Sequence, residues 1–204
     1  MQRLAPEERS PTGQKLRDLT WGDYQSSVGN ALTLTDFSSL HSGGREPCRI
    51  QDEHLRGITL PQLRQLMAFL RNFSGNWEGG RDGTALNPLL MDFADVYDWV
   101  LRPSTYSYRC SFVELIASSA GRQHPRWFVS HAWADPFAQV LEALEMHADV
   151  RGLPSSSPYW LFACAKDFHS GRNDPASAAA VEVALIAGLR QTMGMVIVLG
   201  SSAK

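Results

Sequence analysis

Three short apolar runs alternate with two helical patterns in the last part of the chain. The runs are Trp127-Phe128-Val129, residues 159–165 and residues 195–199. None of them alternates apolar with polar residues, which is typical of strands buried on both faces in a parallel sheet that helices cover. Because crossovers between parallel strands are right-handed, the pattern predicts an open α/β sheet of about three strands.

The two helical patterns between these runs open with the same dipeptide. Asp135-Pro136 and Asp174-Pro175 each join a residue that can cap a helix to a proline, whose missing N–H costs little in the first turn. Gly152-Leu153-Pro154 ends the first pattern, and the second is rich in alanine. We therefore expect residues 123–204 to form a domain of the order strand, helix, strand, helix, strand.

Residues 58–122 predict three amphipathic helices. The first begins after Thr59, the second after Asn87 with Pro88 in its first turn, and Pro103 should end the second. Ser111 and Glu114 have the spacing of a capping box at the start of the third. The apolar stripe of the second helix is Leu90, Phe93, Val96, Tyr97 and Val100. These helices would form a small subdomain or a collar packed on the sheet.

Composition and charge limit the remaining possibilities. Residues 1–57 are rich in Ser, Gly, Thr and charged residues without a period of 3.6 or 2, so we expect mostly loop or disordered chain there. A hydrophobic content of 44% provides for a core, while a net charge of −2 gives no electrostatic argument for binding nucleic acid.

The cysteines and the absence of long apolar segments bear on location. Cys48, Cys110 and Cys164 are widely spaced and odd in number, which favours free thiols in a reducing compartment. The polar N-terminus lacks a signal-peptide core, and no apolar run approaches the roughly 20 residues of a membrane-spanning helix. We expect a cytoplasmic protein that does not bind membranes.

Residues 128–135, Phe-Val-Ser-His-Ala-Trp-Ala-Asp, resemble the first strand and following loop of Toll/interleukin-1 receptor-like (TIR) domains. Ser130 and Asp135 hold the positions at which that family has Ser at the strand end and Asp at the start of the next helix. Tyr159 to Asp167 is similar to the family's second strand, and Gly194 to Ser201 is similar to its third. The resemblance covers Arg126 to Lys204 and implies a partial flavodoxin-like (TIR-like) open parallel sheet.

A second likeness covers more of the chain. From about Thr59, the Trp-rich helices that lead into the Ser-His-Ala-Trp turn are similar to a group of algal proteins. This likeness implies no activity.

The TIR resemblance implies two functions of different classes. One is a signalling or scaffold module that acts by self-association or by binding other TIR-like proteins. The alternative is an NAD(P) glycohydrolase with NAD as substrate, but no position up to Lys204 matches the family's catalytic Glu, so no catalytic residue is assigned. In a 2-1-3-4-5 strand order, residues 195–199 would form an open edge of an apparently truncated domain, or an edge that a partner or the N-terminal region covers.

Ligands of open α/β sheets bind at the carboxyl ends of the strands, where the strand order reverses. The candidate ligand-binding residues at that place are Ser130, His131, Trp133, Asp135, Lys166 and Ser201. In a nucleotide site Trp133 would stack on the base, while Ser130 and His131 would donate hydrogen bonds to ribose or phosphate. The structural alternative is that Asp135 caps a helix, Trp133 fills the core and His131 bonds a backbone carbonyl.

Other reactive side chains give weaker signals. The spacings of His131, His147 and His169 match no metal motif, so no metal site is predicted. Cys164 falls in an apolar run and is expected to be an inert buried thiol.

Overall fold

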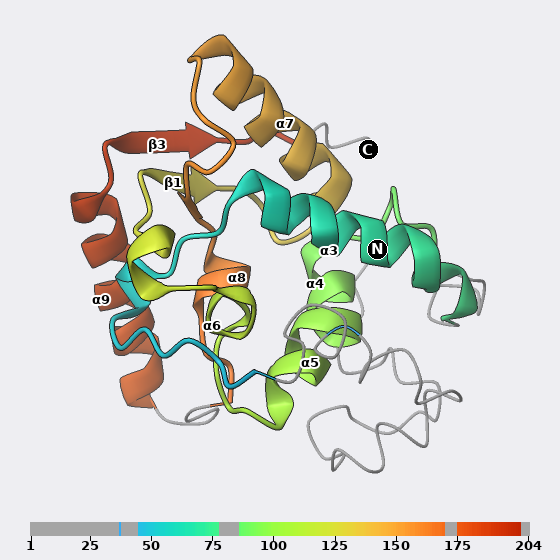
Figure 1. Ribbon diagram of the computed structural model, residues 1–204, viewed down its shortest axis with the longest axis horizontal. Coiled ribbons are helices and arrows are strands. Elements are labelled where there is room, and N and C mark those ends of the chain that lie inside the picture. The colour runs from blue at the N-terminus through green and yellow to red at the C-terminus, as the bar shows by residue number, and fades with distance from the viewer. Residues whose placement is uncertain (1–36, 38–44, 78–85, 170–174, 201–204) are drawn as a thin grey trace.

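The computed structural model describes residue 37 and residues 45–77, 86–169 and 175–200, and it contains a parallel three-stranded sheet (Figure 1). The strands are β1 (Trp127–Ser130), β2 (Tyr159–Trp160) and β3 (Gly194–Ile197), in the order β2-β1-β3. Both pairings are parallel, with Trp127 opposite Tyr159 on one side and Gly194 on the other. The predicted α/β class is confirmed; a flavodoxin-like arrangement stays a prediction.

Two helices cover opposite faces of the sheet. The first, α7 (Phe137–Val150), lies against the face of Trp127 and Val129, where the Trp127 and His147 ring centroids are 4.7 Å apart. The second, α9 (Pro175–Gln191), covers the face of Phe128 and Trp160. Figure 1 shows α7 at the top of the view and α9 at its left. This arrangement is the one expected of right-handed crossovers.

The helices that precede the sheet share its hydrophobic core. Helix α3 (Leu60–Phe73) packs on α7, and Ile58 just before it exchanges two backbone hydrogen bonds with Tyr159, at 2.7 and 2.8 Å. Helix α6 (Phe112–Ile116) packs on α8 (Phe162–Ala165), the short helix after β2. One continuous set of buried side chains therefore runs from these helices into the sheet, as a collar would require.

Residues 45–57, with Phe37, are the described part of the segment expected to be loop. Phe37 is helical, and residues 45–57 contain one short helical turn, η3 (Glu53–Leu55). A similar turn, η6 (Ala120–Gln123), precedes β1. Phe37 is buried, and its ring centroid lies 4.9 Å from that of Phe69 and 5.2 Å from that of Phe112. The segment thus contributes at least one side chain to the core.

The first and third predicted helices begin where the sequence placed them. Thr59 donates its backbone N–H to Gln62 Oε1 at 2.9 Å, and α3 ends at Phe73 before a turn, η4 (Ser74–Asn76). Ser111 and Glu114 form the expected capping box, with the Ser111 N–H donating to Glu114 Oε2 at 2.9 Å. Capping of this kind pairs backbone groups that the first turn leaves without partners.

The predicted bounds of the second helix were wrong at both ends. Asn87 closes a turn by accepting the backbone N–H of Leu89 on Oδ1, and Leu90 is exposed. The helix starts at α4 (Phe93–Val96), with Asp92 as its cap. An Asn-Pro pair suits a turn as well as a helix start, and the pairing of Asp92 with Pro136 decides between them.

The helix also continues through Pro103. A π-helical turn, η5 (Tyr97–Leu101), links α4 to α5 (Arg102–Tyr106). A proline cannot donate to the carbonyl four residues back and its ring collides with it. The wider π turn just before Pro103 changes this geometry, so the proline is accommodated without ending the helix.

The second apolar run forms less strand than predicted. Only Tyr159 and Trp160 pair with β1; Leu161 O then accepts the N–H groups of Cys164 and Ala165, at 3.0 and 2.9 Å, as α8 begins. A short apolar run fits a buried helical turn as well as a strand, so periodicity could not separate them. The helix α9 was correctly predicted, although its expected cap, Asp174, is outside the described residues.

A buried ion pair ties the N-terminal described segment to two helices. Glu114 Oε2 lies 3.4 Å from Arg56 Nη2, and Glu114 Oε1 accepts the Ile50 N–H at 3.0 Å. The Arg56 guanidinium also donates to the carbonyls of Ile50 at 2.8 Å and Ala165 at 3.2 Å. Both side chains are buried, so the attraction between the two charges must offset the free energy that each loses on leaving water.

We expect Glu114→Ala to lower the free energy of unfolding by about 3–5 kcal/mol, because Arg56 would stay buried without its closest carboxylate. Urea denaturation measures the change. Glu145→Ala is the matched control: Glu145 pairs with Arg64 at 2.6 Å on the surface, where such a pair contributes only about 0–1 kcal/mol. If the two substitutions lowered stability equally, the buried pair would not contribute more to stability than the surface pair.

Candidate functional site

The candidate site is the loop that joins β1 to α7 at the carboxyl end of the sheet. Asp135 closes this loop: its Oδ2 accepts the Ala132 N–H at 2.7 Å and its own N–H donates to Ala132 O at 2.9 Å. Its side chain is buried. The predicted capping role of Asp135 is wrong, since α7 begins at Phe137 after Pro136 and has no side-chain cap. The carboxylate therefore stabilises the loop and does not cap the helix.

Gly200, which follows the end of β3, packs on the Asp135 carboxylate. A Cβ built on Gly200 would overlap Asp135 Oδ1, so glycine is needed for the close approach. The strand pairing leads to it, because Val198 N donates to Ser130 O at 2.9 Å beyond the last paired residue of β3. The carboxyl ends of β1 and β3 are therefore brought together, as the switch-point argument expected.

His131 is partly buried and makes its contacts within the chain. Its Nδ1 lies 2.9 Å from Ala132 O, and its ring centroid lies 4.1 Å from that of Phe93. Burial lowers the pKa of His131, outweighing the opposing effects of the bond to Ala132 and of the Asp135 charge. A lowered pKa suits the structural role considered for it.

Trp133 lies on the surface side of an aromatic cluster, which we name the aromatic rim. The residue is 37% exposed, so it does not simply fill the core. The other members lie with ring centroids 6.2–6.4 Å from it: Phe93, Tyr97, Phe162 and Phe168. The exposed indole could stack on a flat or apolar group. Sequence reasoning missed these four partners because they come from α4, η5 and the α8 region.

The remaining predicted site residues do not gather around Trp133 in the same way. Lys166 Nζ is 2.9 Å from Glu53 Oε1 in η3, a pair that holds its side chain to the N-terminal segment. Ser130 is half-buried, and its carbonyl serves the pairing with β3. Ser201 is outside the described residues.

The other two histidines considered for a metal site, His147 and His169, lie in separate environments. His147 Nδ1 is 3.1 Å from the Tyr159 hydroxyl, whereas His169 Nε2 is 2.8 Å from Thr105 Oγ1. Among the residues that the structure describes, no three His, Cys, Asp or Glu side chains are grouped to hold a metal ion.

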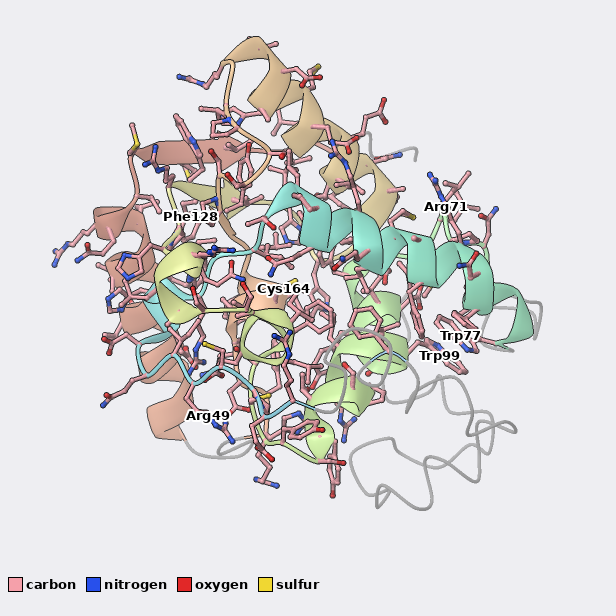
Figure 2. All side chains as sticks on the ribbon, in the orientation of Figure 1. Arg49, Arg71, Trp77, Trp99, Phe128 and Cys164 are labelled. Atoms are coloured by element: carbon pink, nitrogen blue, oxygen red, sulfur yellow. The ribbon has the colours of Figure 1, made fainter. Side chains whose placement is uncertain are left out.

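The cysteines are free thiols, and two of them, Cys110 and Cys164, are buried. Cys164 is fully buried near the middle of the molecule (Figure 2), where burial raises its pKa well above the ordinary value. Burial likewise raises the pKa of Cys110 to about 12. A thiol must ionise to act as a nucleophile, so burial of this kind disfavours a nucleophilic role for both.

Comparison with protein-family models, with curated proteins and with solved structures found no match to this chain. In the described part of the chain, no helix is both long and apolar enough to cross a membrane.

The contact between Gly200 and Asp135 can be tested by a double-mutant cycle. We expect Gly200→Ala to cost about 1–3 kcal/mol of stability, because the added methyl displaces the Asp135 carboxylate from the loop. In the Asp135→Ala background the same substitution should cost little, since the overlapping oxygen is gone. Urea denaturation of the four proteins measures the coupling. Additive effects would show that the two residues do not meet.

Proposed function

We propose that the chain is a TIR-like signalling or scaffold module that binds other proteins, or further copies of itself, through the open edge of its sheet at β3. One observation carries the proposal. Within the described residues β3 pairs only with β1, and the side chains on one of its faces are uncovered. Met195 is 48%, Ile197 57% and Leu199 87% exposed.

The chemistry of this edge suits strand addition. An edge strand offers unpaired N–H and C=O groups, and proteins usually protect it with charged residues, proline or a bulge. Residues 194–200 read Gly-Met-Val-Ile-Val-Leu-Gly and contain neither charge nor proline. An added strand would gain backbone hydrogen bonds and bury the alternate apolar side chains, which is how peptides augment a sheet.

The two faces of β3 support the same interpretation. Val196 and Val198 are half-buried and pack on the core that includes α7. Met195 and Ile197 project to the opposite side, the side of Phe128, where α9 leaves them exposed. Exposed apolar side chains in a row favour an interaction surface over solvated structure.

The first test is to place a charge on this edge. We expect Ile197→Lys to lower the weight-average molar mass of the purified chain in light scattering, because lysine opposes strand addition. Leu90→Lys is the control, since Leu90 is an exposed leucine in a turn that is not part of the sheet. An unchanged mass for Ile197→Lys in a chain that self-associates would argue against β3 as the surface.

A second candidate is the NAD glycohydrolase that the resemblance implies. The exposed indole of Trp133 favours it, since stacking on a nucleobase contributes about 1–3 kcal/mol. If the chain hydrolyses NAD, Trp133→Ala should reduce nicotinamide release roughly tenfold, measured by chromatography. No release from the unsubstituted chain would remove this candidate. It has less support because Asp135 and His131 make their contacts within the loop.

A further inference from the structure

The residues of the β3 edge are nearly symmetric about Ile197. Residues 194–200 read Gly-Met-Val-Ile-Val-Leu-Gly, so glycine stands at both ends, valine flanks the centre on both sides, and Met195 corresponds to Leu199. The exposure of the side chains has the same symmetry, because Met195, Ile197 and Leu199 are exposed while the residues between them are half-buried. A second copy of this segment, running in the opposite direction, therefore presents matching side chains to the first.

The backbone groups of this edge follow the same alternation. Val198 donates its N–H to Ser130 O at 2.9 Å, so it uses the β1 side of the strand. Successive residues of a strand direct their N–H and C=O groups to opposite edges. Ile197 and Leu199, on either side of Val198, therefore direct theirs to the open edge, and so does Met195, two residues before Ile197 in the continuous register with β1.

This symmetry identifies one occupant of the edge. We infer that β3 pairs antiparallel with β3 of a second copy of this chain, about a two-fold axis at Ile197. Ile197 then exchanges both backbone hydrogen bonds with Ile197 of the second copy, and Met195 does so with Leu199. A two-fold contact of this kind uses the same patch on both copies. The inference rests on the proposed function, since it names the partner and its geometry at the same edge.

The backbone of Met193 selects this register over its neighbour. A pairing centred one residue earlier would place Leu199 opposite Met193. The Met193 N–H already donates to Arg126 O at 2.8 Å, on the β1 side, and could not donate to Leu199. The pairing centred on Ile197 leaves none of the outward groups of residues 195, 197 and 199 without a partner.

The charge of the edge also suits a second copy. A two-fold contact brings each charged residue near its own copy, and like charges directly opposite each other are destabilising. Residues 194–200 carry no charge, so two copies approach without this repulsion. The contact involves few residues, and we expect weak association with a Kd on the order of micromolar.

Cysteine trapping tests the position of the axis. The full chain carries Cys48→Ser, because Cys48 is half-buried whereas the other two native thiols are buried. In this background Ile197→Cys should give a disulfide-linked dimer on mild oxidation, measured by non-reducing electrophoresis. The reason is that the Cα atoms of a hydrogen-bonded antiparallel pair lie about 5.5 Å apart, which a disulfide can span.

The matched control is Leu199→Cys, which places a more exposed thiol on the same edge. It should link to itself roughly tenfold more slowly, because its two copies would lie about 13 Å apart along the strands. A mixture of Leu199→Cys with Met195→Cys should link again, since these positions face each other. Equal linking of Leu199→Cys and Ile197→Cys would overturn the two-fold axis at Ile197.

Hydrogen exchange tests the same pairing without any substitution. As the concentration rises through the Kd, the N–H groups of Ile197 and Leu199 should become protected in nuclear magnetic resonance spectra. The Val198 N–H should be protected throughout, because it bonds to Ser130 within one copy. Absence of concentration-dependent protection at Ile197 in a chain that self-associates would overturn the inference.

The outcomes separate this inference from the proposed function. A chain that stays monomeric at every concentration overturns the self-pairing alone, since the edge can still bind another protein. If Ile197→Lys lowers the molar mass but Ile197→Cys does not link, β3 remains the surface and the two-fold geometry is wrong. If Ile197→Lys leaves the mass of a self-associating chain unchanged, both are overturned. Circular dichroism checks that each variant is folded.

Discussion

The buried pair of Arg56 and Glu114 is the interaction on which the arrangement of the described segments depends. Glu114 fixes the start of α6 and holds the Ile50 N–H, while Arg56 reaches the carbonyl of Ala165 at the end of α8. Residues 50–56, α6 and α8, which are distant in sequence, thus come together around the charges of Arg56 and Glu114. Because isolated buried charges are costly, the pair strongly disfavours arrangements in which any of these segments is out of place.

The sequence predicted most reliably what short-range physics determines. The three apolar runs gave the sheet, and the capping residues Thr59 and Ser111 gave two helix starts. It failed where tertiary contacts choose between local alternatives. Asn87-Pro88 suits a turn or a helix, and the pairing of Asp92 with Pro136 selects the turn. No local rule could show that the π turn before Pro103 would keep that helix intact.

The candidate site divides in the same way. Its place at the carboxyl end of β1 followed from topology, and Gly200 does meet Asp135 there. The role of Asp135 did not follow, since a carboxylate before Pro136 could bond to the helix or back to Ala132, and only the loop geometry decides. The aromatic rim around Trp133 could not be predicted from the sequence, because its members come from separate segments. Their proximity depends on the helical collar packing on the sheet.

The distribution of unused binding capacity is what supports the proposed association in preference to catalysis. At the loop, the polar groups that could act on a ligand already bond within the chain, as Asp135 and His131 do. At β3 and along α9 the reverse holds, since apolar side chains and the outer edge of a strand lie open. Full burial of an exposed apolar side chain of this size contributes about 1.5–3 kcal/mol, and covering these partly exposed side chains would contribute a corresponding fraction of that. A protein surface can cover such a row, whereas a small ligand at the loop cannot, so the larger favourable free energy is available to a partner protein.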